Sequence, residues 1–208
     1  MAQYLAVPEG NGRHPGVVLV HEWWGVNEQI KSIADRWAKE GFVCFVPDLF
    51  NDKIAANATE AEAMMNSLDY PAAVEKIEAA VATLKVDSRC TEKVALTGYC
   101  MGGALTFLAA TMVPGLAAVV PFYGVPGNAD WSKIDAPVMA HFATRDDWAT
   151  VDAGMKIKEA IDKVSSMDLH LYDADHAFCN DRRPEVYNPS ACAQAWDRTV
   201  TFVRRLTA

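Results

Sequence analysis

The stretch KVALTGYCMGG at residues 93–103, followed by the apolar ALTFLAA at residues 104–110, decides the fold of this chain. Residues 93–97 form a short apolar run that predicts a buried strand, and residues 104–110 are typical of a helix. The glycines between them predict a tight turn. A side chain that projects from so sharp a turn needs neighbours without a β-carbon, because strand and helix crowd together there. Cys100 lies between two such glycines and is therefore a candidate nucleophile.

This strand, turn and helix resemble the nucleophile elbow of the α/β-hydrolases, whose pattern is G-x-S-x-G, with cysteine in place of serine. The flanking glycines are Gly98 and Gly102. The first N–H groups of the following helix point back at the turn, so the Met101 N–H is a candidate donor to an oxyanion. The alternative is that Cys100 is a small buried apolar side chain beside an ordinary turn.

The composition is that of an ordinary globular protein, with 51% hydrophobic and 22% charged residues among 208. A formal net charge of −8 argues against binding nucleic acid through bulk electrostatics. Residues 1–6 lack the basic start of a secretory signal, and no apolar run reaches the length of a membrane span. We therefore expect a cytoplasmic protein that binds neither nucleic acid nor membranes.

The five cysteines are spread along the chain, without the paired spacing of a zinc site or the density of a disulfide framework. Reduced thiols are the expectation. Cys44 lies in an apolar run and Cys192 on a predicted terminal helix, so both are assigned to packing. Cys179 stays open, because it is close to a candidate catalytic histidine.

Strands and helices alternate along the chain, which predicts an α/β fold with a mostly parallel sheet and helices on both faces. Asn27 is the expected N-cap of the first helix and Gly41 its C-terminal stop. We expect one domain over residues 1–208, with a polar region at 47–57 and a long loop at 123–136. The predicted strands are 16–20, 42–46, 93–97, 116–122, 138–142 and 168–172, and the predicted helices are 27–40, 71–85, 104–110, 151–164 and 190–206.

Reactive side chains follow the predicted strands, where the binding groups of a parallel sheet gather. Cys100, Asp146 and His176 occur in the chain order of the α/β-hydrolase triad. Their expected roles are thiol nucleophile, carboxylate that orients the imidazole, and general base. Asp147 is the chief rival of Asp146. Two further carboxylates near the histidine are expected to be solvated or turn-forming on a loop, namely Asp173 and Asp175.

Several segments together resemble the dienelactone hydrolase family, a branch of the α/β-hydrolases that cleaves lactone esters with a Cys, Asp and His triad. The matching segments are HEWWGVN at 21–27, VPDL at 46–49, GYCMGG at 98–103, FYG at 122–124, HFATRD at 141–146 and HAF at 176–178. The resemblance implies that Glu22 is an active-site glutamate that contacts the resting thiol and helps to deprotonate it. It also implies that the Trp23 and Met101 N–H groups form the oxyanion hole.

The chain departs from that family where the substrate carboxylate is held by arginines. Asn180 stands four residues after the candidate histidine in place of one arginine, and residues 51–53 offer no arginine for the other. A less anionic substrate is therefore expected, with Asn180 among the residues that contact it. The candidate substitutes for the missing arginines are Lys53, Arg145, Arg182 and Arg183, and the aromatic residues expected to line an apolar pocket are Trp23, Trp24, Tyr123, Trp131, Trp148 and Phe178.

The main hypothesis is a hydrolase of small lactones or other carboxylic esters that acts through a thioester acyl-enzyme on Cys100. The alternatives are a general carboxylesterase without lactone preference and a catalytically silent module that binds a ligand or senses redox state through Cys100. No metal or organic cofactor is implied. We expect a monomer or a weak homodimer.

Overall fold

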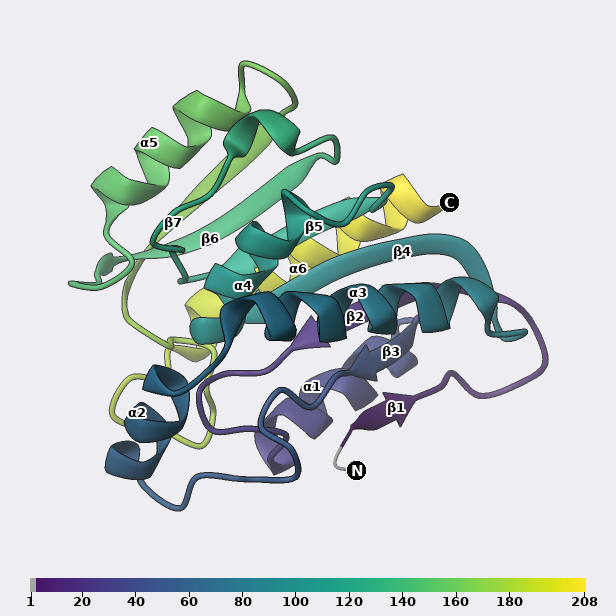
Figure 1. The fold of residues 1–208 in the computed structure, drawn as a ribbon, viewed down its shortest axis with the longest axis horizontal. Helices are drawn as coiled ribbons and strands as arrows, with labels where there is room; N and C mark the ends of the chain where they lie inside the picture. Colours follow the sequence, from purple (N-terminus) through teal and green to yellow (C-terminus); the bar gives the residue numbers. More distant parts are fainter. Residues whose placement is uncertain (1–2) are drawn as a thin grey trace.

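The computed structural model describes residues 3–208, which build one twisted sheet flanked by helices (Figure 1). The strand order is β1-β3-β2-β4-β5-β6-β7, and every neighbouring pair is parallel except β1 with β3. The strands are β1 (Tyr4–Ala6), β2 (His14–Val20), β3 (Val43–Val46), β4 (Cys90–Tyr99), β5 (Ala118–Phe122), β6 (Val138–Arg145) and β7 (Met167–Asp175). The helices are α1 (Glu28–Lys39), α2 (Ala58–Asn66), α3 (Tyr70–Val86), α4 (Met101–Ala110), α5 (Val151–Ile161) and α6 (Pro189–Thr207), with a short 3-10 helix at Trp131–Lys133. The predicted mostly parallel sheet is confirmed.

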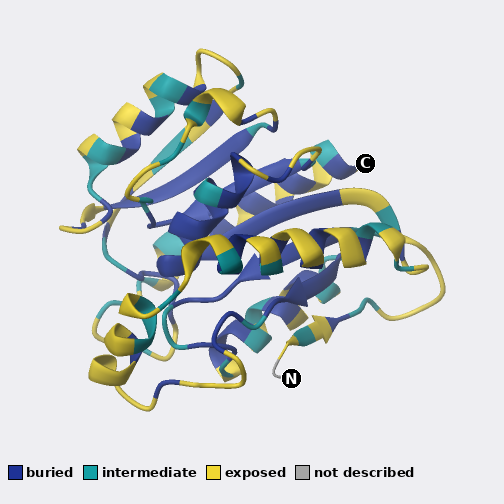
Figure 2. Cartoon of the chain, viewed as in Figure 1, coloured by how far each residue is buried: buried dark blue, intermediate teal, exposed yellow. Residues whose placement is uncertain are grey.

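Helices cover both faces of the sheet because successive strand residues point to opposite sides. On β2, Val18 and Val20 belong to the core layer under α3, α4 and α5, whereas Val17 and Leu19 belong to the layer under α1 and α6. The central strands are buried along most of their length, while α2 is largely exposed (Figure 2). Two full hydrophobic layers therefore hold the strand ends, and the loops that follow them, in fixed positions.

The predicted helix at 27–40 is confirmed as α1, and so are the residues predicted to begin and end it. Asn27 Oδ1 accepts a hydrogen bond from the Ile30 N–H at 3.1 Å, and Gly41 has a φ of +89° just beyond the helix. Sequence patterns missed β1, which is three residues long, and α2, which lies just beyond the polar region at 47–57 and buries only Ala61. Both lack the long periodic apolar pattern that a prediction needs.

The last strand is longer than predicted, which corrects the placement of two carboxylates. β7 continues to Asp175, so Asp173 and Asp175 lie on a strand and not on a loop. β6 likewise continues to Arg145, which is the register partner of Asp175. Polar residues extend these two strands beyond the apolar runs that mark them in the sequence.

Candidate active site

Cys100 stands in the turn between β4 and α4 with a φ of +56° and a ψ of −119°, an unusual backbone conformation for a residue with a side chain. The turn is tight because neighbouring backbone comes close. A β-carbon on Gly98 would lie 2.3 Å from Gly102 O, and one on Gly102 would lie 2.3 Å from Val20 O. The two glycines are therefore required by space, as the sequence indicated.

The side chains after β4, β6 and β7 meet as one hydrogen-bonded chain. His176 Nε2 lies 3.2 Å from Cys100 Sγ, and His176 Nδ1 lies 2.6 Å from Asp146 Oδ2. The other carboxylate oxygen, Asp146 Oδ1, accepts the Trp148 and Ala149 N–H groups at 2.9 Å each. Asp147 is exposed on the same turn. The geometry thus favours Asp146 over its rival as the partner of the imidazole.

The charge on Asp146 is stabilised by these partners. Burial alone would raise the pKa of this carboxyl, but the hydrogen bond and charge of His176, with the two backbone N–H groups, bring it below its usual value. An anionic carboxylate at this position holds the proton of the imidazole on Nδ1. Nε2 is then free to accept a proton from the thiol of Cys100.

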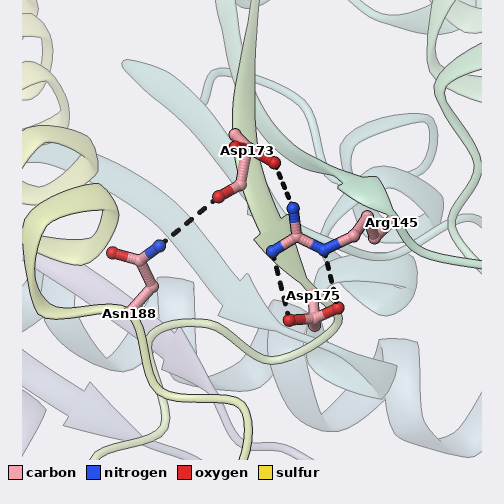
Figure 3. A network of polar contacts seen from close by, with 4 residues as sticks. All are labelled: Arg145, Asp173, Asp175 and Asn188. Carbon is pink, nitrogen blue, oxygen red and sulfur yellow. Dashed lines mark hydrogen bonds and ion pairs between the residues drawn. The ribbon is translucent and has the colours of Figure 1, made fainter.

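An ion pair ties the two strand ends that carry Asp146 and His176. Arg145 donates to both oxygens of Asp175, at 3.0 and 3.3 Å, and also to Asp173 (Figure 3). Asn188 Nδ2 donates to Asp173 O from the start of α6. Arg145 and Asp175 directly precede Asp146 and His176 in the chain, so this exposed cluster joins the two segments that carry the acid and the histidine.

Glu22, on the loop after β2, is a carboxylate without access to solvent. Tyr123 Oη donates to Glu22 Oε1 at 3.3 Å, and Asn180 Nδ2 donates to Glu22 Oε2 at 2.6 Å. Burial raises the pKa of Glu22, while the Asn180 hydrogen bond, the His176 charge and the Tyr123 hydroxyl oppose that rise. The side chain is held beside the nucleophile, and the net effect of burial and these partners is a raised pKa of Glu22.

Burial also raises the pKa of the Cys100 thiol, and the nearby charge of Glu22 raises it further. The Met101 N–H lowers it, as the positive end of a helix does, and Arg183 lowers it too. The effects that raise the pKa of the thiol outweigh those that lower it, which favours the neutral form.

His21 was not among the predicted site residues, although it precedes Glu22 in the chain. Its Nδ1 donates to Glu22 O at 2.6 Å, and its Nε2 accepts the Leu49 N–H at 3.2 Å, so the ring is held from both sides. Burial lowers the pKa of His21 to about 4. A neutral imidazole thus fixes the peptide unit that carries the Trp23 N–H, the second expected donor of the oxyanion hole. Its sequence signals were its place at the end of a buried strand and at the start of the segment HEWWGVN.

A cavity of about 220 Å³ opens over the thiol, and its walls are mostly apolar. Trp148 lines it as predicted, with its ring centroid 5.4 Å from that of His176. The lining residues are Glu22, Trp23, Met65, Cys100, Trp148, His176, Ala177 and Arg183. Sequence patterns missed Met65, which lies on the unpredicted α2, and Arg183 was one of four basic candidates.

Other residues expected to contact substrate are placed elsewhere, which corrects the predicted pocket. Phe178 and Tyr123 are fully buried and pack on each other with ring centroids 5.2 Å apart. Asn180 is buried and turned to Glu22. Trp24 lies outside the lining with its ring against Trp23, and Trp131 packs on Phe107. Tyr123 and Asn180 are turned from the cavity because their polar atoms bind Glu22, whereas the other three side chains pack against aromatic rings.

Within residues 3–208, no three His, Cys, Asp or Glu side chains are grouped so that they could hold a metal ion. None of the helices in that part of the chain is both long enough and apolar enough to cross a bilayer.

A mostly parallel sheet with a nucleophile elbow after β4 and an acid and a histidine after later strands defines the α/β-hydrolase class. Within that class the chain belongs to the dienelactone hydrolase family, whose pattern matches residues 1–207. It is therefore a hydrolase, and the resemblance noted from its motifs is confirmed.

Relatives match over nearly the whole chain. Protein usf of Aquifex pyrophilus is 36% identical over 97% of this chain and 91% of its own, and the carboxymethylenebutenolidase of Pseudomonas sp. is 30% identical over 98% and 89%. A solved structure of a dienelactone hydrolase-like promiscuous phosphotriesterase from metagenomic libraries superposes with a TM-score of 0.84 at 23% identity, over 96% of this chain and 89% of that one. The last likeness concerns the fold alone.

Proposed function

We propose that this protein hydrolyses small lactones and other small carboxylic esters through a thioester acyl-enzyme formed on Cys100. One observation carries the proposal: the continuous contact from Asp146 through His176 to Cys100 Sγ, at 2.6 and 3.2 Å, at the floor of an apolar cavity. A nucleophile, a base and an orienting acid in hydrogen-bond contact are the arrangement that covalent catalysis of acyl transfer needs.

The reaction begins with a neutral thiol. His176 Nε2, 3.2 Å from Cys100 Sγ, takes its proton when an ester enters the cavity, and the family resemblance implies that Glu22 assists this step. The sulfur then attacks the carbonyl carbon, and the oxyanion that develops is met by the Trp23 and Met101 N–H groups. His176 returns the proton to the leaving alkoxide. Water, deprotonated by His176, hydrolyses the thioester and restores the thiol.

The cavity supports a small substrate with one polar or anionic group. Its volume of about 220 Å³ suits a small ring or short ester, and apolar walls favour such a ligand. Arg183 is the one arginine or lysine among the described residues that line it. In a lactone the alkoxide stays attached to the acyl group after ring opening, so the same site serves both substrate types.

The test is a burst experiment with a p-nitrophenyl ester. Wild type is expected to release about one equivalent of nitrophenol per protein before steady turnover, and the acyl group is expected on Cys100 by mass spectrometry. Cys100→Ala abolishes both the burst and the adduct. Cys192→Ala is the matched control, because that thiol lies outside the cavity, and it keeps the burst. A burst that survives in Cys100→Ala contradicts the proposal, as does binding of esters without turnover in wild type.

A comparison of kcat/KM for a lactone panel and for open-chain aryl esters separates a lactonase from a general carboxylesterase. Higher values for the lactones support the proposed preference. Higher values for the aryl esters assign the general activity to the same site.

A further inference from the structure

Cys179 and Cys192 lie together on the wall of a second cavity, of about 100 Å³, between α1 and α6. This cavity is separate from the one over Cys100, with which it shares no lining residue. The mechanism proposed above uses neither thiol. Their sequence positions did not indicate that they are neighbours, because Cys179 lies in the turn after β7 and Cys192 lies near the start of α6.

The backbone holds the two segments in a fixed relation. The Asn188 N–H donates to Phe178 O at 3.0 Å, and the Cys192 N–H donates to Asn188 O at 2.9 Å. Asn188 is also the N-cap of α6, since its side chain accepts the Ala191 N–H. Asn188 thus connects the backbone beside Cys179 to the first turn of α6. The side chains of Cys179 and Cys192 line the same cavity and are near enough to influence each other's pKa.

The two thiols are chemically different. The hydrogen bond from Cys179 lowers the pKa of Cys192, burial opposes this, and the Arg36 guanidinium lowers it further. Burial and that same hydrogen bond raise the pKa of Cys179. Cys192 is partly exposed and Cys179 is buried. The pair therefore consists of a partly exposed thiol with a lowered pKa and a buried thiol with a raised pKa beside it.

The cavity is suited to a small hydroxylic molecule. Gln29 is buried and lines it, and Gln29 Oε1 has no hydrogen-bond partner among the described residues. Gln29 and the two cysteines thus line one small cavity with an acceptor that has no partner within residues 3–208. Water and hydrogen peroxide both carry an O–H group, and both fit the volume.

We propose that Cys179 and Cys192 form a dithiol–disulfide redox site that small peroxides oxidise. The Cys192 thiolate attacks one peroxide oxygen, so that an S–O bond forms, the O–O bond breaks and hydroxide leaves as water after taking a proton. The Cys179 sulfur, having lost its proton, then attacks the Cys192 sulfur of the sulfenic acid. The S–S bond forms, the S–O bond breaks and a second water leaves. Two thiols and one peroxide give one disulfide and two waters, and a dithiol reductant reverses the change.

The proposed redox site includes Cys179, which lies on the segment that supports the active site around Cys100. Cys179 stands between Phe178, which packs on Tyr123, and Asn180, which holds Glu22. The proposal concerns the pair itself and does not depend on the ester hydrolysis proposed above.

The test uses the full chain with Cys100→Ala, so that the active-site thiol does not react. After hydrogen peroxide and removal of the excess, the protein is expected to lose the mass of two hydrogen atoms and to regain it with dithiothreitol. Trypsin separates the two cysteines, because Arg182 lies between them, into peptides 164–182 and 183–198. These two peptides are expected to be joined in the oxidised sample and separate in the reduced one.

Single variants assign the roles. In Cys179→Ser the Cys192 sulfenic acid is expected to persist and to be trapped by dimedone, whereas Cys192→Ser leaves Cys179 alkylatable after peroxide. The proposal is overturned if, in the protein with both thiols, iodoacetamide added in denaturant after peroxide still labels Cys179 and Cys192, or if either joins another cysteine. Because the peptide map of that protein decides the question, a folding defect in a single variant does not.

Discussion

Asn180 Nδ2 donates a hydrogen bond of 2.6 Å to Glu22 Oε2, although the two residues are 158 positions apart in the chain. The residue that replaces the family's arginine thus acts on a buried carboxylate and not on the cavity. Hydrogen bonds to charged groups contribute about 1.5–3 kcal/mol, so Asn180→Ala is expected to lower kcat/KM by roughly 10- to 100-fold. The pKa of Glu22 rises further without this donor, and the acid limb of the pH profile of kcat/KM moves to higher pH.

Asn128→Ala, on an exposed loop, is the matched control and leaves the profile unchanged. A uniform drop in kcat/KM with no shift of the acid limb would mean that Asn180 serves packing alone.

Arg183 decides how well the cavity accepts an anion. Arg183→Ala is expected to raise KM for an ester with a carboxylate by about 10-fold and to leave KM for a neutral ester of similar size nearly unchanged, because a charge-assisted contact is lost. Arg182→Ala is the control, because Arg182 is the next residue in the chain but is exposed and does not line the cavity. Initial rates with the two esters measure the effect. Equal changes for both esters would assign Arg183 to the shape of the wall.

The Arg145 to Asp175 ion pair positions the acid and the histidine from outside. Arg145→Ala is expected to lower kcat by about two- to fivefold with KM unchanged, because exposed ion pairs contribute little. Salt near 1 M should reduce kcat of wild type toward that of the variant, since it screens exposed charges. Lys163→Ala serves as the control, because it removes a different exposed ion pair, the one between Lys163 and Glu159 on and after α5. A change confined to KM would refute the positioning role.

The buried neutral His21 makes folding sensitive to acid. Its pKa is about 4 in the folded protein and near 6.5 in the unfolded chain, so only the unfolded chain takes up a proton between these values. The free energy of unfolding is therefore expected to fall as pH falls from about 6.5 to 4, by about 2 kcal/mol between pH 7 and pH 5. Urea titrations at several pH values measure it.

In His21→Asn the amide is expected to keep the hydrogen bond to Glu22 O. The free energy of unfolding of this variant is expected to lose about 2 kcal/mol less than that of wild type between pH 7 and pH 5. His141, whose pKa burial also lowers, contributes a remaining slope in the same direction. An unchanged slope in the variant would assign the acid sensitivity to other groups.

Local patterns were sufficient to place the three triad candidates after strands, although β6 and β7 end three residues later than predicted. Cys100 follows an apolar run and sits between glycines, and Asp146 and His176 follow later strands, because burial in a parallel sheet requires continuous apolar segments whose carboxyl ends meet at one edge. The same patterns failed for α2, and with it for Met65, because a mostly exposed helix carries no such segment.

The sequence by itself determined the elbow, the parallel sheet and the order of nucleophile, acid and base, since these depend on neighbours along the chain and on the periodic burial of apolar residues. Tertiary structure alone decided that Asn180 and Tyr123 hold Glu22, that Arg183 faces the cavity and that Cys179 meets Cys192. Those outcomes depend on the directions of side chains from segments far apart in the chain, and a hydrogen bond or a cavity wall exists only once packing has fixed the distance between them.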